Sequence, residues 1–411
     1  MPDGTAAIPQ QHIGGEYALV SEREGYLKAV STIGAGSGPI AVDAERASGY
    51  RYSQRAHLIQ VFRKNAGIFL FDAPAIGRFD ELQAAIETDE WVLHAASQDL
   101  ACLREVGLSP STIFDTELAA RLLGLPRVGL GTVVGDLLGL HLAKEHSASD
   151  WSVRPLPEAW LKYAALDVEL LVDLRDAIGH LLDEANKSDI AAAEFAHVLA
   201  KDPAPLRREP WRRLSGIHGL RSARQLAVAR ELWIARDDLA RDLDLAPGRL
   251  VPDAAFVAVA KTSPTTRREL QSLSEFTGRA SRSELDRWWA AIERGAATSD
   301  LPELRPSSES LPPQRSWPEK NPPADVRLRL ARGAVAEVAA EVKIPIENVL
   351  APDLLRRISW EPPVRLTDTD VRSALVSLGA RAWQRDLVSE TIAHAFVEAS
   401  QTIKEPVEHD S

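Results

Sequence analysis

Four short apolar segments of strand character follow one another between residues 39 and 96 of this 411-residue chain. They read PIAVDAE, AHLIQVF, AGIFLFDA and EWVLHAA, and only a few residues around RKN separate the second from the third, which is typical of a hairpin. Helical patterns follow at 97–108, 115–125 and 156–185, and the last is expected to be one long helix. Strands in succession with helices after them predict an α/β domain in which helices flank a mixed sheet.

The first of these segments ends in two acidic residues, Asp43 and Glu45. Because side chains alternate between the faces of a strand, both carboxylates project from the same face. Neighbouring carboxylates at the end of a buried strand repel each other and lose hydration, unless a divalent cation offsets their charge. The pair therefore indicates either a cation site or a solvated strand end.

Asp99 and the pair Tyr163 and Asp167 stand in helical patterns farther along the chain. Asp99 falls in the first turn of a helix for which Ser97 is the expected N-cap. Tyr163 and Asp167 are spaced i, i+4, so they project from one face of their helix. Taken singly, the three residues also suit an acid favoured by the helix dipole, a core tyrosine and a surface aspartate.

In their order and spacing, these residues resemble the DEDDy 3′→5′ exonucleases of the ribonuclease D family. The words AVDAE, LIQVF, VLHAASQDL, FDTELAARLLG, DWSVRPL and YAALDVELL occur in family order over about residues 38–185. The resemblance implies an RNase H-like fold and two bound divalent cations, Mg²⁺ or Mn²⁺. Such a pair of ions can activate a water molecule and stabilise the leaving 3′ oxygen without a covalent intermediate. It also implies that Tyr163 orients the attacking water and that four acids hold these ions. These acids are Asp43, Glu45, Asp99 and Asp167.

Three residues near these motifs are candidates for contact with nucleic acid. Gln60 lies on the strand expected beside the one that carries Asp43, at the edge of the active site. Trp151 and Arg154, both in DWSVRPL, would stack on a base and contact a phosphate. The alternative interpretation of this segment is that Trp151 packs in the core.

The rest of the chain is helical and interrupted by proline-rich segments. Residues 211–293 resemble the helicase-and-RNase-D C-terminal (HRDC) domain, on segments such as WRRLSGIHGL and ELDRWWAAI. Residues 326–403 resemble a second, diverged copy, because Pro352-Asp353 repeats the setting of Pro252-Asp253 one hundred positions later. The expected divisions are a flexible N-terminus at 1–20, a DEDDy exonuclease domain at 21–200, a linker at 201–210, a first HRDC domain at 211–293, a proline-rich linker at 294–325 and an HRDC-like domain at 326–403.

Charge is distributed unevenly along the chain. The net charge of −11 argues against a protein that simply coats nucleic acid. Residues 205–290 nevertheless carry 16 Lys and Arg against 11 Asp and Glu. We expect the densest basic cluster to contact RNA phosphates, and a solvated linker with Trp211 in the core is the alternative. This cluster consists of Arg207, Arg208, Arg212 and Arg213.

Cysteine content and hydropathy bear on the compartment. Cys102 is the only cysteine, which excludes an intramolecular disulfide and a thiolate zinc site and fits a reducing cytoplasm. Its apolar setting in DLACLREVGL predicts a buried structural residue. The sequence has no apolar stretch of about 18 residues and no signal-peptide pattern, so we expect a cytoplasmic protein without membrane association.

Together these observations predict a metal-dependent 3′→5′ exoribonuclease that releases nucleoside 5′-monophosphates. The resemblance implies that its substrates are tRNA precursors and structured small RNAs with 3′ tails, and we expect a monomer. One alternative is a DNA 3′→5′ exonuclease acting on single-stranded DNA, since the metal site would be the same. Two others are a nucleic-acid-binding scaffold with a silent nuclease domain and a protein-interaction module.

Overall fold

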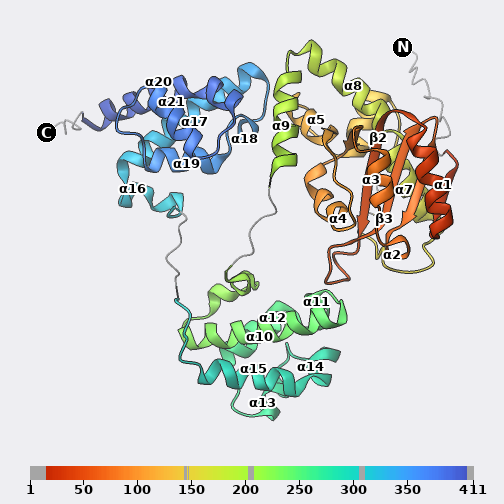
Figure 1. The fold of residues 1–411 in the computed structure, drawn as a ribbon. Coiled ribbons are helices and arrows are strands. Elements are labelled where there is room, and N and C mark those ends of the chain that lie inside the picture. Colours follow the sequence, from red (N-terminus) through yellow and green to blue (C-terminus); the bar gives the residue numbers. More distant parts are fainter. Residues whose placement is uncertain (1–14, 143–145, 147, 202–207, 305–310, 405–411) are drawn as a thin grey trace, which may run out of the picture.

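A mixed six-stranded sheet forms the centre of the first part of the chain, in a computed structural model that describes residues 15–142, 146, 148–201, 208–304 and 311–404 (Figure 1). The strand order is β1-β4-β3-β2-β5-β6; β3 runs antiparallel to β2 and β4, and the other neighbours are parallel. The strands are β1 (Tyr17–Val20), β2 (Ser37–Arg46), β3 (Ala56–Lys64), β4 (Gly67–Asp72), β5 (Glu90–Leu93) and β6 (Thr112–Asp115). The expected α/β fold with a β3–β4 hairpin is confirmed.

Helices cover both faces of this sheet. On one face α7 contacts β2, β3 and β4, and α8 contacts β2 and β5. Phe71 of β4 points to the opposite face, where its ring meets that of Tyr26 in α1 at 5.9 Å. The helices are α1 (Arg23–Gly34), α2 (Ala73–Ile76), α3 (Asp80–Ala85), α4 (Leu100–Glu105), α5 (Thr116–Leu122), α6 (Leu130–Leu138), α7 (Glu158–Glu169), α8 (Leu171–Glu184) and α9 (Ser188–Ala200).

The structure corrects two expectations in this part. The segment expected to be one long helix at 156–185 is two, because the chain turns at Leu170 between α7 and α8. The apolar period continues across the turn, since Val168 and Leu171 are both buried as each helix packs on the sheet. The N-terminal segment at 1–20 includes strand β1, which pairs with β4, so its described end is ordered sheet rather than a loose lead-in.

Two helical regions follow, and Figure 1 shows them as separate groups of helices. The first is built on a core of its own around Trp288 and Phe256. The second shares one continuous apolar core with the exonuclease domain. The first contains α10 (Ala223–Leu243), α11 (Pro247–Leu250), α12 (Asp253–Thr262), α13 (Arg267–Ser272), α14 (Arg279–Ser283) and α15 (Leu285–Ala297). The second contains α16 (Trp317–Lys320), α17 (Pro322–Val342), α18 (Ile346–Val349), α19 (Pro352–Trp360), α20 (Asp368–Ser377) and α21 (Ala382–Lys404).

The second of the two expected linkers is shorter than the sequence suggested. The proline-rich stretch at 294–325 contains the end of α15, all of α16 and the start of α17, where two prolines occupy the first turn. Most of the linker expected at 201–210 lies outside the described residues. Across the described residues, no helix combines the length and the apolar character needed to cross a membrane.

Candidate active site

Acidic side chains from β2 and α7 meet on one face of the sheet. Asp43 and Glu45 project from β2, and Asp167 projects from α7 toward them. One carboxylate oxygen from each of these three residues lies within 4.8 Å of the others. They line a cavity of about 370 Å³ together with Asp99 and Tyr163. The structure therefore brings together all five residues that the sequence singled out.

Asp99 reaches this cavity from the end of β5. It occupies the N-cap position of α4, but its side chain caps no backbone group and instead lies 3.6 Å from the guanidinium of Arg46. The expectation that Ser97 caps this helix is wrong, because Ser97 lies inside a short 3-10 turn at Ala96–Gln98. Strand β5 ends at Leu93, and Ala95, directly before the turn, has left-handed backbone with a φ of 63°.

Burial and mutual repulsion disfavour the ionised forms of the four acids. Burial raises the pKa of Glu45 to about 10, and the charges of Asp43, Asp167 and Asp99 add to the effect. Burial raises the pKa of Asp99 and of Asp167 to about 8 each, with further contributions from Asp43. Burial also raises the pKa of Asp43, against a backbone hydrogen bond and the charge of Arg46. A site with this electrostatic deficit favours a bound cation.

Tyr163 lies beside the acids, and its ring packs against two other aromatic rings. Its hydroxyl hydrogen-bonds to Asp167, one helical turn along α7. The ring centroid lies 6.5 Å from that of Trp151 and 6.0 Å from that of His146. Burial and the neighbouring Asp167 raise the pKa of Tyr163 well above its usual value, so the phenol stays protonated.

The other residues expected near the site have different surroundings. Gln60 pairs with Asp43 across the sheet and is fully buried, and neither atom of its amide has a hydrogen-bond partner among the described residues. Trp151 is also fully buried, which agrees with the alternative interpretation that it packs in the core. No face of its ring is open for stacking on a base. Arg154 is bound to Asp72 and to the carbonyl of His57 at 2.9 Å, which ties its loop to the sheet.

The basic cluster that precedes the first helical region is only partly free. Arg208 and Arg213 are exposed. Arg212 pairs with Glu209 at 2.6 Å and lies 4.4 Å above the buried ring of Trp211. Arg207 lies outside the described residues. Contact of this cluster with RNA stays a prediction.

Two residues that support the site carried little signal in the sequence. Asp115, at the end of β6, accepts backbone hydrogen bonds from Ala95 at 3.0 Å and Ala96 at 2.9 Å, and so holds the turn that places Asp99. Arg46 faces the acids from the residue after Glu45 and is 27% exposed in its side chain. Its position directly after the acidic pair is the one signal in the sequence that indicates a role for Arg46 at the site.

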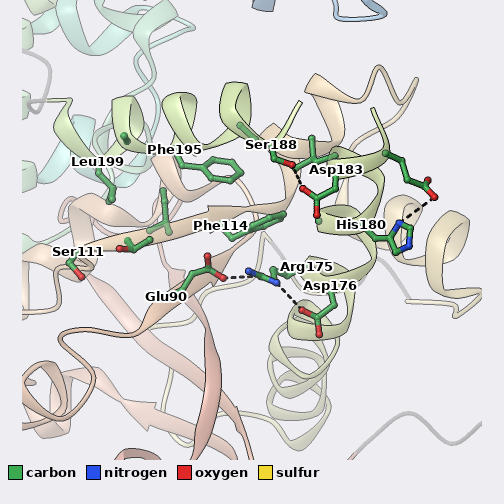
Figure 2. Close-up of a pocket in the computed structure, with 18 residues that line it drawn as sticks. Glu90, Ser111, Phe114, Arg175, Asp176, His180, Asp183, Ser188, Phe195 and Leu199 are labelled. Carbon is green, nitrogen blue, oxygen red and sulfur yellow. Dashed lines mark hydrogen bonds and ion pairs between the residues drawn. The ribbon is translucent and has the colours of Figure 1, made fainter. Parts of the chain in front are cut away.

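A larger cavity, of about 700 Å³, lies away from the acids between β6, α8 and α9 (Figure 2). The rings of Phe114 and Phe195, with centroids 5.1 Å apart, lie against each other in its lining. Its ionic side chains bind one another, since Arg175 contacts both Glu90 and Asp176. Glu90 and Asp176 are neutralised by Arg175, whereas Asp43, Glu45 and Asp167 form no ion pair among the described residues, so this cavity is not the better candidate for a metal centre.

The mixed sheet and its acidic cavity define a protein with a 3′–5′ exonuclease domain. Residues 18–183 match the family described as 3′-5′ exonuclease, residues 225–292 match the HRDC domain, and residues 310–396 match the 3′ to 5′ exonuclease C-terminal domain. The chain belongs to the ribonuclease D family. Its last region matches a family other than HRDC, so a second HRDC copy there stays a prediction.

Known relatives support this membership over most of the chain. It is 31% identical over 278 residues to ribonuclease D of Gluconacetobacter diazotrophicus, covering 66% of this chain and 67% of that protein. It is 33% identical to ribonuclease D of Pseudomonas paraeruginosa, covering 75% and 78%. A crystal structure of a protein from Bifidobacterium adolescentis is 36% identical with a TM-score of 0.85, covering 92% and 97%. Escherichia coli RNase D, at 23% identity and a TM-score of 0.68, covers 93% and 99% and shares the fold.

Proposed function

We propose that this enzyme, a 3′→5′ exoribonuclease, removes nucleotides one at a time from RNA 3′ ends and releases nucleoside 5′-monophosphates. The observation that carries the proposal is the convergence of the acids of β2 and α7, with Tyr163 beside them, on one cavity. Ribonuclease D relatives favour RNA over DNA as the substrate and an active enzyme over a silent scaffold.

The donor set suits divalent cations. Carboxylate oxygens are the ligands that Mg²⁺ and Mn²⁺ prefer, and three of them lie within 4.8 Å of one another. We infer that four acids hold two such ions, namely Asp43, Glu45, Asp99 and Asp167. When bound, the ions would supply charge stabilisation for an in-line displacement at a phosphodiester.

The protein's own residues orient the reaction. Tyr163 is protonated and hydrogen-bonded to Asp167, so it can position a water molecule but cannot act as a general base. Arg46 lies next to Asp99 and offers positive charge beside the cavity. The cavity of about 370 Å³ is of a size to receive a single terminal nucleotide.

The finer substrate assignment follows the family. We propose tRNA precursors and structured small RNAs with single-stranded 3′ tails as substrates, with Mg²⁺ or Mn²⁺ as the ion. That the enzyme works as a monomer in the cytoplasm is likewise a prediction from the sequence.

A tRNA-like RNA with a 3′ extension and a 5′ label tests the proposal, beside a DNA of matched sequence. With Mg²⁺ or Mn²⁺ the RNA should yield a ladder shortened from the 3′ end, and a chelator should abolish it. Asp43→Asn should lower turnover by about 100-fold or more, because one carboxylate of the site is lost. Asp189→Asn, an exposed acid in the first turn of α9, is the control and should be as active as the parent enzyme. A ladder from Asp43→Asn at the parent's rate would refute the site assignment.

A further inference from the structure

The loop between β2 and β3 connects the active-site strand to the HRDC domain. It spans residues 47–55, begins directly after Arg46, and reaches from the sheet toward α11 in Figure 1. Arg249 of α11 donates to the carbonyl of Gly49 at 2.7 Å, and its guanidinium lies 3.9 Å above the ring of Tyr50. The backbone of Ala246 donates to the carbonyl of Tyr50 at 3.0 Å. The HRDC domain therefore holds the main chain of this loop directly.

The second half of the loop also contacts the HRDC domain. Tyr52 packs against the core of the HRDC domain, and its hydroxyl donates to Asp237 at 3.0 Å. The backbone of Ser53 donates to Asp244 at 2.9 Å, and Arg55 lies 3.8 Å from the same carboxylate. We call this set of contacts the interdomain clamp. It consists of Gly49, Tyr50, Tyr52, Ser53 and Arg55 on the loop and Asp237, Asp244, Ala246 and Arg249 on the HRDC domain.

The start of the same loop forms one wall of a second cavity beside the metal-binding acids. This cavity, of about 270 Å³, is lined by Ser48 and Gly49 on one side and Ala148 and Ser149 on the other. It shares Ala44, Glu45 and Arg46 with the cavity of the acids, so the two are neighbours. Among the described residues that line either cavity, Arg46 is the only lysine or arginine.

We propose that this second cavity holds the nucleotide next to the 3′-terminal one and that the HRDC domain shapes it through the interdomain clamp. The inference rests on the proposed function, because it takes the terminal nucleotide to lie at the acids. An RNA strand leaving that cavity passes Arg46, whose guanidinium suits a phosphate, and then Ser48 and Gly49. Arg249 fixes the carbonyl of Gly49, so it is a positioning residue that acts on the RNA through the loop.

Two substrates separate the subsites. A hexanucleotide RNA fills both, whereas in the p-nitrophenyl ester of uridine 5′-monophosphate a nitrophenyl leaving group, released as nitrophenol, replaces the whole of the next nucleotide. In Arg249→Ala the KM for the hexanucleotide should rise about tenfold, since one charge-assisted hydrogen bond is lost, while kcat stays the same. Hydrolysis of the ester should match that of the parent enzyme. Arg267→Ala, which removes an HRDC arginine that lies near the Trp289 ring outside the clamp, should leave both substrates unaffected.

An unchanged KM for the hexanucleotide in Arg249→Ala would overturn the proposal, as would an equal loss on the ester. Tyr52→Phe removes a second clamp contact, the hydrogen bond to Asp237, and should repeat the pattern, which protects the test against misfolding of one variant. Binding measured in an Asp43→Asn background needs no turnover. There Arg249→Ala should weaken binding of the hexanucleotide and leave that of uridine 5′-monophosphate unchanged. This experiment tests the clamp even if the parent enzyme fails to degrade RNA, which would refute the proposed function alone.

Discussion

The two helical regions share a plan of helices but attach to the catalytic domain in different ways. Each region contains a helix of 21 residues, α10 or α17, and both helices are followed by a residue with left-handed backbone, Asp244 or Lys343. Each is followed by a four-residue helix and then by a helix that starts at or directly after a proline, α12 and α19. The HRDC domain keeps its own core and touches the catalytic domain through the polar clamp.

The second region is attached through apolar packing and buried charge. Its core is continuous with that of the catalytic domain. Glu194 of α9 is 5% exposed and binds both Arg381 and the indole of Trp383. Lys187 donates to the carbonyls of Leu122 and Lys343, one on each side of the interface. The comparison indicates that the second region is a structural part of the catalytic unit, whereas the HRDC domain is a separate unit whose contacts reach the loop that follows β2.

The largest effect is expected from Trp288→Ala, which tests whether the HRDC domain unfolds on its own. Trp288 is fully buried at the centre of that core, and truncation should cost the domain about 3–5 kcal/mol of unfolding free energy. Calorimetry should show one transition moved to lower temperature and a second unmoved, with hydrolysis of the p-nitrophenyl ester retained. Trp289→Ala, its half-exposed neighbour, is the control and should shift the first transition far less. A parallel fall of both transitions would break the comparison.

A somewhat smaller effect is expected from Glu194→Ala at the other interface. Removing this carboxylate leaves Arg381 without its partner in a largely buried position, at a cost of about 3 kcal/mol. Because the second region and the catalytic domain share a core, their joint transition should move and that of the HRDC domain should not. Asp189→Ala, on the exposed side of the same helix, provides the matched control. Loss confined to a separate C-terminal transition would contradict the shared unit.

The sequence indicated the catalytic residues better than it indicated these attachments. Asp43 and Glu45 could be found because charge at the end of an apolar strand is locally anomalous, and Tyr163 and Asp167 because helical spacing brings them together. Asp115 could not be found in this way, since its bonds to Ala95 and Ala96 span about 20 residues and depend on the paired ends of β5 and β6. Site residues were therefore predictable from the sequence where a local pattern, such as strand alternation or helical spacing, marks them.

Features that depend on distant partners were missed. No glycine or proline marks the break at Leu170. The buried apolar stripe also continues from one helix to the next, so the local pattern reads as a single helix. Strand β1 is four residues long and pairs with β4, about 50 residues away. Tyr52 and Asp237 are 185 residues apart, and nothing near either residue in the sequence indicates that they form a hydrogen bond.

Cation binding should stabilise only the unit that contains the acids. At a Mg²⁺ concentration of about 100 times its Kd, the free energy of unfolding of that unit should rise by about 2.7 kcal/mol, with the HRDC transition unchanged. The folded-state pKa of Glu45 is raised to about 10 and that of Asp167 to about 8, so without metal the folded state loses stability as pH rises from the ordinary carboxyl pKa of about 4 up to these values. At one fixed Mg²⁺ concentration, the gain in unfolding free energy should therefore be greater at pH 8.5 than at pH 6, because ionised acids bind the ion more tightly, and calorimetry at the two pH values would show this. An equal gain in Asp43→Asn would argue against the site.

The smallest effect concerns acid pH and the strand that follows the clamp loop. His57 is 2% exposed, and burial together with the charges of Arg55, Arg154 and Arg51 lowers its pKa to about 4, against the opposing effect of Asp244. A lowered folded-state pKa means that the unfolded chain binds the proton more readily, so the contribution is intact above pH 6.5 and is lost as pH falls toward 4. His57→Gln should therefore flatten part of the fall in stability between pH 6.5 and 4, measured by urea unfolding. His94 is partly buried and its pKa is also lowered to about 4, so it contributes to the same fall in stability, and a double variant should flatten the profile further. Because His57 belongs to β3 of the catalytic sheet, its variant should alter the catalytic unit's profile and leave that of the HRDC core unchanged.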